Sequence, residues 1–275
     1  MWPGRFIAGN TIKKALVVAE KTLEINKYPI INYAIEYTNY PNRVLTEHLN
    51  MVQYLNYKYK IAIKVSSFNF DEDLIDTLVN HCVNKNIRVI IDAENQLHYG
   101  QYEDIVSYLM KKHNKYIPYV IKTYQMYRKN GLDTLENDFI DSRLNDYHLG
   151  IKLVRGAYFH SEYLDGHLFT KKKDTDESYN KAILFIGDNH NKEYIILATH
   201  NIDSIRLGFM YNRNAKQQVF DFAHLMGMQE ENYQLLSNKG ANVNVYIPYG
   251  PYIKMLPYLT RRMYENMDML QYMYK

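Results

Sequence analysis

The sequence is poor in the features that mark several protein classes. Its 275 residues include one cysteine, Cys82, which excludes an intrachain disulfide framework and favours a reducing compartment. No apolar run approaches the roughly 18–20 residues of a membrane-spanning helix. The 33 basic and 30 acidic residues are interspersed and sum to +3, which argues against a nucleic-acid partner.

Targeting signals and several cofactor motifs are also missing. The first 25 residues contain no long apolar stretch and carry Glu20 and Glu24, so neither a signal peptide nor a transit peptide is expected. We therefore expect a cytoplasmic location, or a peripheral one at a membrane. There is no GxGxxG, GxxxxGK, HExxH, paired CxxC or GxSxG motif, and the ten histidines are scattered. No metal site is predicted.

Short apolar segments separated by helical patterns are what the sequence does contain. Eight candidate strands cover residues 30–37, 61–68, 87–94, 116–125, 149–158, 193–200, 217–225 and 242–250. Between two of them, residues 71–86 repeat apolar side chains at helical spacing, with Asp71 placed to cap the helix. Such alternation predicts an α/β fold, a (β/α)8 barrel in a single domain over residues 1–275. An open doubly wound sheet is the alternative.

The predicted strands end in polar residues, where a barrel places its catalytic groups. Each has an ordinary interpretation as well, such as a lysine reaching water or an aspartate capping a helix. Six of eight strand ends share this character, and their cations suit an anionic ligand. The polar residues at these ends are Lys64, Asp92, Glu94, Gln125, Lys152, Arg155, Tyr158, Thr199, His200, Asn201, Tyr246 and Tyr249.

One further cationic group lies near the end of the chain. Arg261, Arg262 and Glu265 can share one face of a helix. They form either a surface salt bridge or a guanidinium pair that binds a carboxylate.

Ten short motifs occur in order along almost the whole chain. They read RFIAGNT, IKVSSF, IDAE, TYQMY, KLVRGAY, KKDTDESY, ATHN, LMGM, VYIPYG and RRMYEN. In this order they resemble the proline dehydrogenase family, in its monofunctional form. The resemblance implies a distorted barrel whose last helix covers the mouth. It also implies oxidation of L-proline to 1-pyrroline-5-carboxylate, non-covalently bound FAD, and a quinone as electron acceptor.

The resemblance also assigns roles to individual residues. It implies substrate contacts for Lys64, Leu153, Tyr158, Tyr246, Arg261 and Arg262. It implies cofactor contacts for Ala93, Gln125, Lys152, Val154, Arg155, Gly156, Ala157, Phe159, Lys172, Thr199, His200, Asn201 and Glu265. The residues expected to take part in catalysis are Lys64, Asp92, Lys152, Tyr246 and Glu265.

Two departures and three alternatives remain open. The chain reads KLVRGAY where many bacterial members read RLVKGAY, and Phe159 replaces a common tryptophan. By the resemblance, the bulk of Tyr246 implies a preference for proline over 4-hydroxyproline. The alternatives are a Schiff-base aldolase using Lys64 or Lys152, a non-catalytic relative, and a hydroxyproline dehydrogenase. The oligomeric state is open, and the C-terminal MLQYMYK is a weak candidate for membrane contact.

Overall fold

The structure is a computed structural model that describes residues 3–255 and residue 260. Its strands form a closed parallel barrel in the order β1 to β8, which confirms the predicted (β/α)8 architecture. The strands are β1 (Tyr28–Tyr33), β2 (Lys60–Lys64), β3 (Arg88–Asp92), β4 (Val120–Gln125), β5 (Gly150–Val154), β6 (Tyr194–Ala198), β7 (Phe220–Leu225) and β8 (Val243–Tyr249).

Helices alternate with these strands. The α-helices are α1 (Pro3–Phe6), α2 (Ile12–Glu24), α3 (Pro41–Val52), α4 (Glu72–Asn84), α5 (Tyr99–His113), α6 (Gly131–Leu144), α7 (Phe159–Glu162), α8 (Lys172–Asn189), α9 (Ile202–Asn214) and α10 (Glu230–Asn238). The described residues also contain the short 3-10 helices η1 (Val65–Phe68), η2 (Gln96–His98) and η3 (Tyr163–Asp165). The helix predicted over the barrel mouth falls outside the described residues.

Helix α4 shows how the local sequence sets an element. Asp71 accepts a hydrogen bond from the backbone N–H of Leu74 at 3.1 Å, so the predicted cap is confirmed. Ile75, Leu78 and Cys82 of the apolar stripe are fully buried. The helix is therefore held by its amphipathic face and its N-terminal cap.

Several predicted strands prove shorter than their apolar runs. The run 61–68 ends as a strand at Lys64 and continues as η1. The run 116–125 pairs only from Val120, whose N–H and C=O both bond the buried side chain of Asn114 at 2.8 Å. The run 149–158 ends at Val154, two residues before Gly156 at φ +143°. Side-chain bonds and special backbone angles, which periodicity does not reveal, set these ends.

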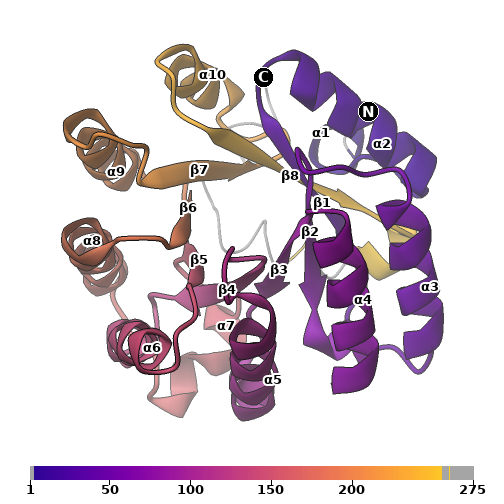
Figure 1. Cartoon of the computed structure of the whole chain (residues 1–275), viewed down its shortest axis with the longest axis horizontal. Coiled ribbons are helices and arrows are strands. Elements are labelled where there is room, and N and C mark those ends of the chain that lie inside the picture. The colour runs from indigo at the N-terminus through magenta and orange to yellow at the C-terminus, as the bar shows by residue number, and fades with distance from the viewer. Residues whose placement is uncertain (1–2, 256–259, 261–275) are drawn as a thin grey trace. The chain divides into compact units, whose positions relative to one another are not determined.

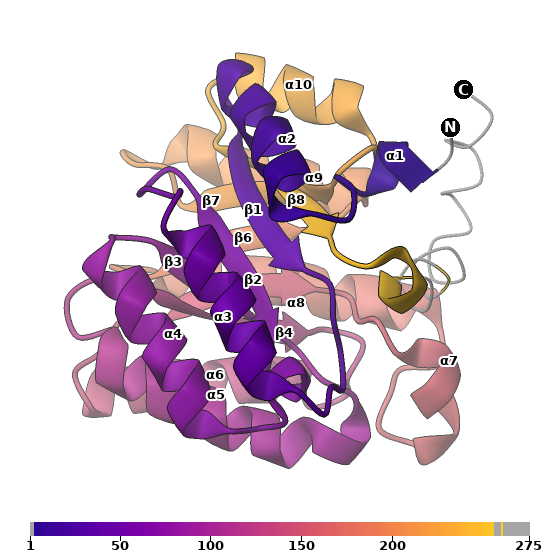
Figure 2. The ribbon, with the colours of Figure 1, turned by 90° about the vertical axis from the view of Figure 1, so that its right-hand side faces the viewer.

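The chain divides into two compact units. Unit 1 comprises Met1–Asp92 and Ala223–Lys275. In it β1 pairs with both β2 and β8, and β2 pairs with β3. Helices α3 and α4 pack side by side (Figure 2).

The interior face of unit 1 is identified by one polar contact. Lys60 Nζ donates to Asn244 Oδ1 at 2.8 Å, and β1 lies between their strands, so this contact crosses the interior. Because side chains alternate along a strand, Lys64 and Tyr246 share that interior face. The register places Asp92 beside Lys64.

Unit 2 spans Ala93–Phe222. Strand β5 pairs with β4 on one side and β6 on the other. Helix α8 lies between α6 and α9 (Figure 1). On β4, Lys122 and Tyr124 reach carboxylates of the covering helices, so Thr123 and Gln125 lie on the opposite face.

Candidate functional site

In unit 1, three of the predicted catalytic residues lie together. Tyr246 donates its phenolic O–H to Asp92 Oδ2 at 2.5 Å, and both side chains are buried. Lys64 is paired with Asp92 in the strand register. Its Nζ lies 3.9 Å from Glu36 Oε1. Glu36 was not predicted as a site residue, although it lies within the apolar run 30–37, three residues after the end of β1.

This group combines a cation at the carboxyl end of β2 (Lys64), a carboxylate at the carboxyl end of β3 (Asp92) and a phenol in the middle of β8 (Tyr246). Asp92 is 9% exposed, and the short hydrogen bond from Tyr246 fixes the position of its carboxyl group. The Lys64 ammonium can bind the carboxylate of an amino acid, and the Asp92 carboxylate can bind its ammonium.

In unit 2, Arg155 is the centre of a second polar group. Its Nε donates to Asp176 Oδ1 at 2.6 Å and its Nη2 to Ser204 Oγ at 3.0 Å. Its Nη1 donates to Thr199 Oγ1. Lys172 Nζ donates to the other oxygen of Asp176 at 2.7 Å. The structure thus brings the predicted residues Arg155, Lys172 and Thr199 together.

Asp176 and Ser204, which hold this group, were not predicted. Burial alone would raise the pKa of Asp176. The hydrogen bonds and positive charges of Lys172 and Arg155 outweigh this effect, so the pKa is lowered from the usual 3.8. The Arg155 guanidinium also lies 4.5 Å from the centre of the Tyr179 ring. Three of its five N–H groups have the partners above, which leaves donors suited to phosphate oxygens.

Asn201 has a structural role in the same region. Its Oδ1 accepts hydrogen bonds from the N–H groups of Asp203 and Ser204 at 3.0 and 3.1 Å, which caps α9. Thr199 Oγ1 accepts from the N–H of Asn201 at 3.0 Å. His200 lies between these two residues at the start of α9. The ATHN motif therefore builds a helix N-terminus, which favours negative charge.

Gln125 and Lys152 form a third group on β4 and β5. Lys152 is the register partner of Thr123, so both lie on the face that carries Gln125. Val154 is the register partner of Gln125. Both polar side chains are buried. An amide and an ammonium on one face can donate hydrogen bonds to a planar, acceptor-rich ring.

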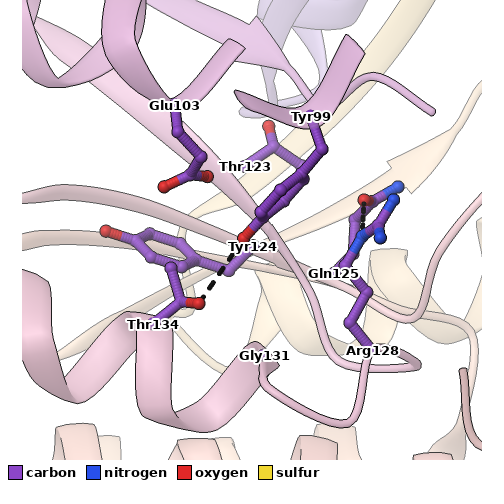
Figure 3. Close-up of a pocket in the computed structure, with 8 residues that line it drawn as sticks. All are labelled: Tyr99, Glu103, Thr123, Tyr124, Gln125, Arg128, Gly131 and Thr134. Atoms are coloured by element: carbon purple, nitrogen blue, oxygen red, sulfur yellow. Dashed lines mark hydrogen bonds between the residues drawn. The ribbon is translucent and has the colours of Figure 1, made fainter. Parts of the chain in front are cut away.

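A narrow pocket opens beside this group, on the side of β4 that α5 and α6 cover (Figure 3). It is lined by Tyr99, Glu103, Thr123, Tyr124, Gln125, Arg128, Gly131 and Thr134. Within it Gln125 and Arg128 are joined by a hydrogen bond (Figure 3). Of its lining residues, Gln125 was predicted from the sequence and the others were not.

Two further predicted residues, Leu153 and Gly156, have different surroundings. The register pairs Leu153 with Tyr124, which places Leu153 on the helix-covered face and away from Lys152. The space beside Gly156 is taken by the Tyr127 ring, 2.4 Å from where a Cβ would stand. Glycine is needed there because of its φ of +143° and because that ring leaves no room for a side chain.

The remaining predicted residues are placed as follows. Ala93 and Tyr158 are buried, and Ala157 is half-buried. Phe159 stacks on Tyr163 with ring centres 6.1 Å apart. Arg261, Arg262 and Glu265 lie outside the described residues. In the described part of the chain, no cluster of three metal-ligating side chains occurs and no helix is long and apolar enough to cross a membrane.

The chain is a (β/α)8 barrel with charged and polar side chains at the carboxyl ends of its strands, where barrel enzymes place their active sites. The sequence model of the family described as proline dehydrogenase matches residues 18–275. The chain belongs to the proline dehydrogenase family.

Individual relatives agree with this assignment. Proline dehydrogenase 1, mitochondrial, from Dictyostelium discoideum is 31% identical over 209 residues, which cover 70% of this chain and 36% of the relative. The human protein of that name is 27% identical over 230 residues, covering 75% and 38%. The CarD protein of carbapenem antibiotic biosynthesis from Pectobacterium carotovorum is 30% identical over 192 residues, covering 69% and 51%. The chain thus spans between a third and a half of the length of these relatives.

Solved structures support the fold. The structure of proline utilization A from Bdellovibrio bacteriovorus, inactivated by N-propargylglycine, superposes with a TM-score of 0.88 at 17% identity. The match covers 96% of this chain and 32% of that one. At this identity the likeness shows a shared fold.

Proposed function

We propose that this chain oxidises L-proline to 1-pyrroline-5-carboxylate, the first step of proline catabolism, with bound FAD and a quinone as electron acceptor. The observation that carries the proposal is the family match over residues 18–275. The polar groups found at the predicted strand ends support it. We further propose that residues 1–275 act as one catalytic domain.

The substrate would be held by the unit 1 group. The ammonium of proline suits the Asp92 carboxylate, and its carboxylate suits Lys64. Tyr246 fixes Asp92 through their hydrogen bond and adds bulk that favours proline over 4-hydroxyproline. By the family resemblance, Arg261 and Arg262 would also bind the substrate carboxylate. Fixing both ends of a small substrate lowers the entropic cost of reaching the reactive geometry.

The residues of unit 2 fit FAD. Its diphosphate requires cations and hydroxyl donors, which Arg155, Lys172 and Thr199 supply. Its isoalloxazine ring requires buried donors, which Gln125 and Lys152 supply. When bound, the flavin would supply the redox chemistry, and the protein supplies orientation and electrostatics. A cation such as Lys152 beside the ring favours negative charge that develops there.

Turnover by purified protein supplied with FAD tests this proposal. The wild type should convert L-proline to 1-pyrroline-5-carboxylate with a soluble quinone as acceptor, and 4-hydroxyproline should react more slowly. Lys152→Met should reduce kcat at least about tenfold, because a donor to the reacting ring is lost. Lys173→Met is the matched control, since Lys173 is exposed on α8. A protein that binds FAD but is inactive on both substrates would contradict the proposed reaction. Borohydride trapping of substrate on a colourless protein would support the Schiff-base alternative.

A further inference from the structure

Arg128 is a buried cation that the proposed function has not used. It lies in the turn after β4 and is 2% exposed. Its Nε donates to Gln125 Oε1 at 2.8 Å, and its Nη1 donates to Gln96 Oε1. The guanidinium also lies 4.5 Å from the centre of the Tyr99 ring. A buried cation with so many fixed partners has one preferred orientation.

This contact decides which way the Gln125 amide points. A guanidinium only donates hydrogen bonds, so the Gln125 atom that faces it must be the oxygen. The amide nitrogen then points elsewhere, and its partner in unit 2 is the Tyr127 hydroxyl at a long 3.4 Å. Gln125 is thereby set to act as a hydrogen-bond donor toward a ligand.

Glu162 on α7 holds the arginine in turn. Its Oε2 lies 3.3 Å from Arg128 Nη2 and accepts the Tyr127 O–H at 3.0 Å. Its Oε1 accepts the N–H of Gln96 at 2.6 Å. The carboxylate is nearly fully buried, so it both neutralises Arg128 and restricts its orientation.

We propose that Arg128, held by Glu162, is a positioning residue that fixes the Gln125 amide with its nitrogen directed at an acceptor atom of the isoalloxazine ring. The inference rests on the proposed binding of FAD. A hydrogen bond donated to the ring strengthens as the ring gains electrons, because bonds to charged acceptors are roughly twice as strong. The arrangement therefore favours the reduced cofactor. One such bond corresponds to about a tenfold change in the equilibrium constant for reduction, or about 30 mV for two electrons.

A double-mutant cycle on the reduction potential of bound FAD tests this inference without relying on turnover. Its variants are R128M/E162Q, which removes both buried charges together, then Gln125→Leu, and the combination of all three. In the wild-type background, R128M/E162Q should lower the equilibrium constant for reduction of bound FAD about tenfold. In the Gln125→Leu background, the same two substitutions should leave that constant unchanged. Lys129→Met, at the neighbouring exposed position, should leave the potential unchanged.

The possible outcomes separate the two proposals. An equal shift in both backgrounds, or none in either, would overturn the positioning role while FAD binding stood. A protein that binds no FAD would overturn the proposed function together with this inference. If R128M/E162Q does not fold, Arg128→Lys carries the same test, because lysine keeps the charge beside Glu162 but lacks the guanidinium fork.

Discussion

Lys122 provides a sharp test of the packing outside the site. It lies on β4 with its side chain 1% exposed, and its Nζ is 2.6 Å from both Glu103 Oε2 and Asp138 Oδ2. Tyr124 donates its O–H to the same Asp138 oxygen at 2.7 Å. Burial lowers the pKa of Lys122, but the two carboxylates more than offset this, so the net pKa is raised. The lysine is therefore charged, and two helices depend on it.

Replacing Lys122 by methionine keeps the length of the side chain and removes its charge. Breaking a buried ion pair by deleting one partner costs about 3–5 kcal/mol. Glu103 and Asp138 are 25% and 19% exposed, so water screens part of their repulsion and we expect about 3 kcal/mol. That loss corresponds to roughly 6–12 °C in Tm, at about 2–4 °C per kcal/mol for a large domain.

The loss should also depend on pH. Burial raises the pKa of Glu103, and the charge of Lys122 partly counteracts this. Without Lys122 that pKa rises further. The folded state then holds a proton that the unfolded chain has released, so the stability of the variant falls as pH rises above about 4.5. Urea unfolding of wild type and variant at pH 5 and pH 8 should give the larger difference at pH 8.

The matched control is Lys111→Met, which breaks an exposed ion pair with Asp141. Exposed pairs contribute about 0–1 kcal/mol. Equal losses for the Lys122 and Lys111 variants would refute the assignment of Lys122 as the charge centre between α5 and α6. So would a Lys122→Met variant whose loss is the same at both pH values.

Three further predictions concern stability. Burial lowers the pKa of His48 to about 4, so the stability of the wild type should decrease as pH falls from 6.5 to 4. Urea unfolding of His48→Leu should show a weaker pH dependence over that range. Gly156→Ala should cost about 1–3 kcal/mol in thermal unfolding because of its φ and its close ring contact. Gly166→Ala, at φ +75° with open space beside it, should cost less, and the reverse order would contradict the reasoning. Asp176→Asn should reduce the free energy of unfolding by about 1 kcal/mol at pH 7. This difference should vanish as pH falls through the lowered pKa of the Asp176 carboxyl. The control Glu177→Gln, at an exposed position, should change stability by under about 0.5 kcal/mol. A pH-independent loss for Asp176→Asn would argue against the ion pair as its cause.

The barrel could be predicted because its signal is repeated along the chain. Each apolar run and each helical stripe is local, and α4 with its Asp71 cap follows the sequence closely. The exact residues at which strands begin and end were harder to predict from the sequence. The start of β4 depends on Asn114, and the end of β5 is followed by the special backbone of Gly156.

Candidate site residues could be named from the sequence where one strand end carries its own chemistry, as at Asp92 and Arg155. They could not be named where a side chain contacts a partner distant in sequence. Asp176 lies 21 residues from Arg155, and Glu162 lies 34 residues from Arg128. Asp176 lies in the second turn of α8 and Glu162 is the last residue of α7, and an acidic residue at such a position has no distinct sequence signal.

The most direct test of the proposed function is the visible spectrum of the purified protein with FAD, before and after anaerobic addition of L-proline. We predict a bound yellow flavin whose absorbance is bleached by L-proline and restored by a quinone. A bound flavin that L-proline leaves unchanged would contradict the proposed substrate. A protein that stays colourless after incubation with FAD would contradict the flavoenzyme account as a whole.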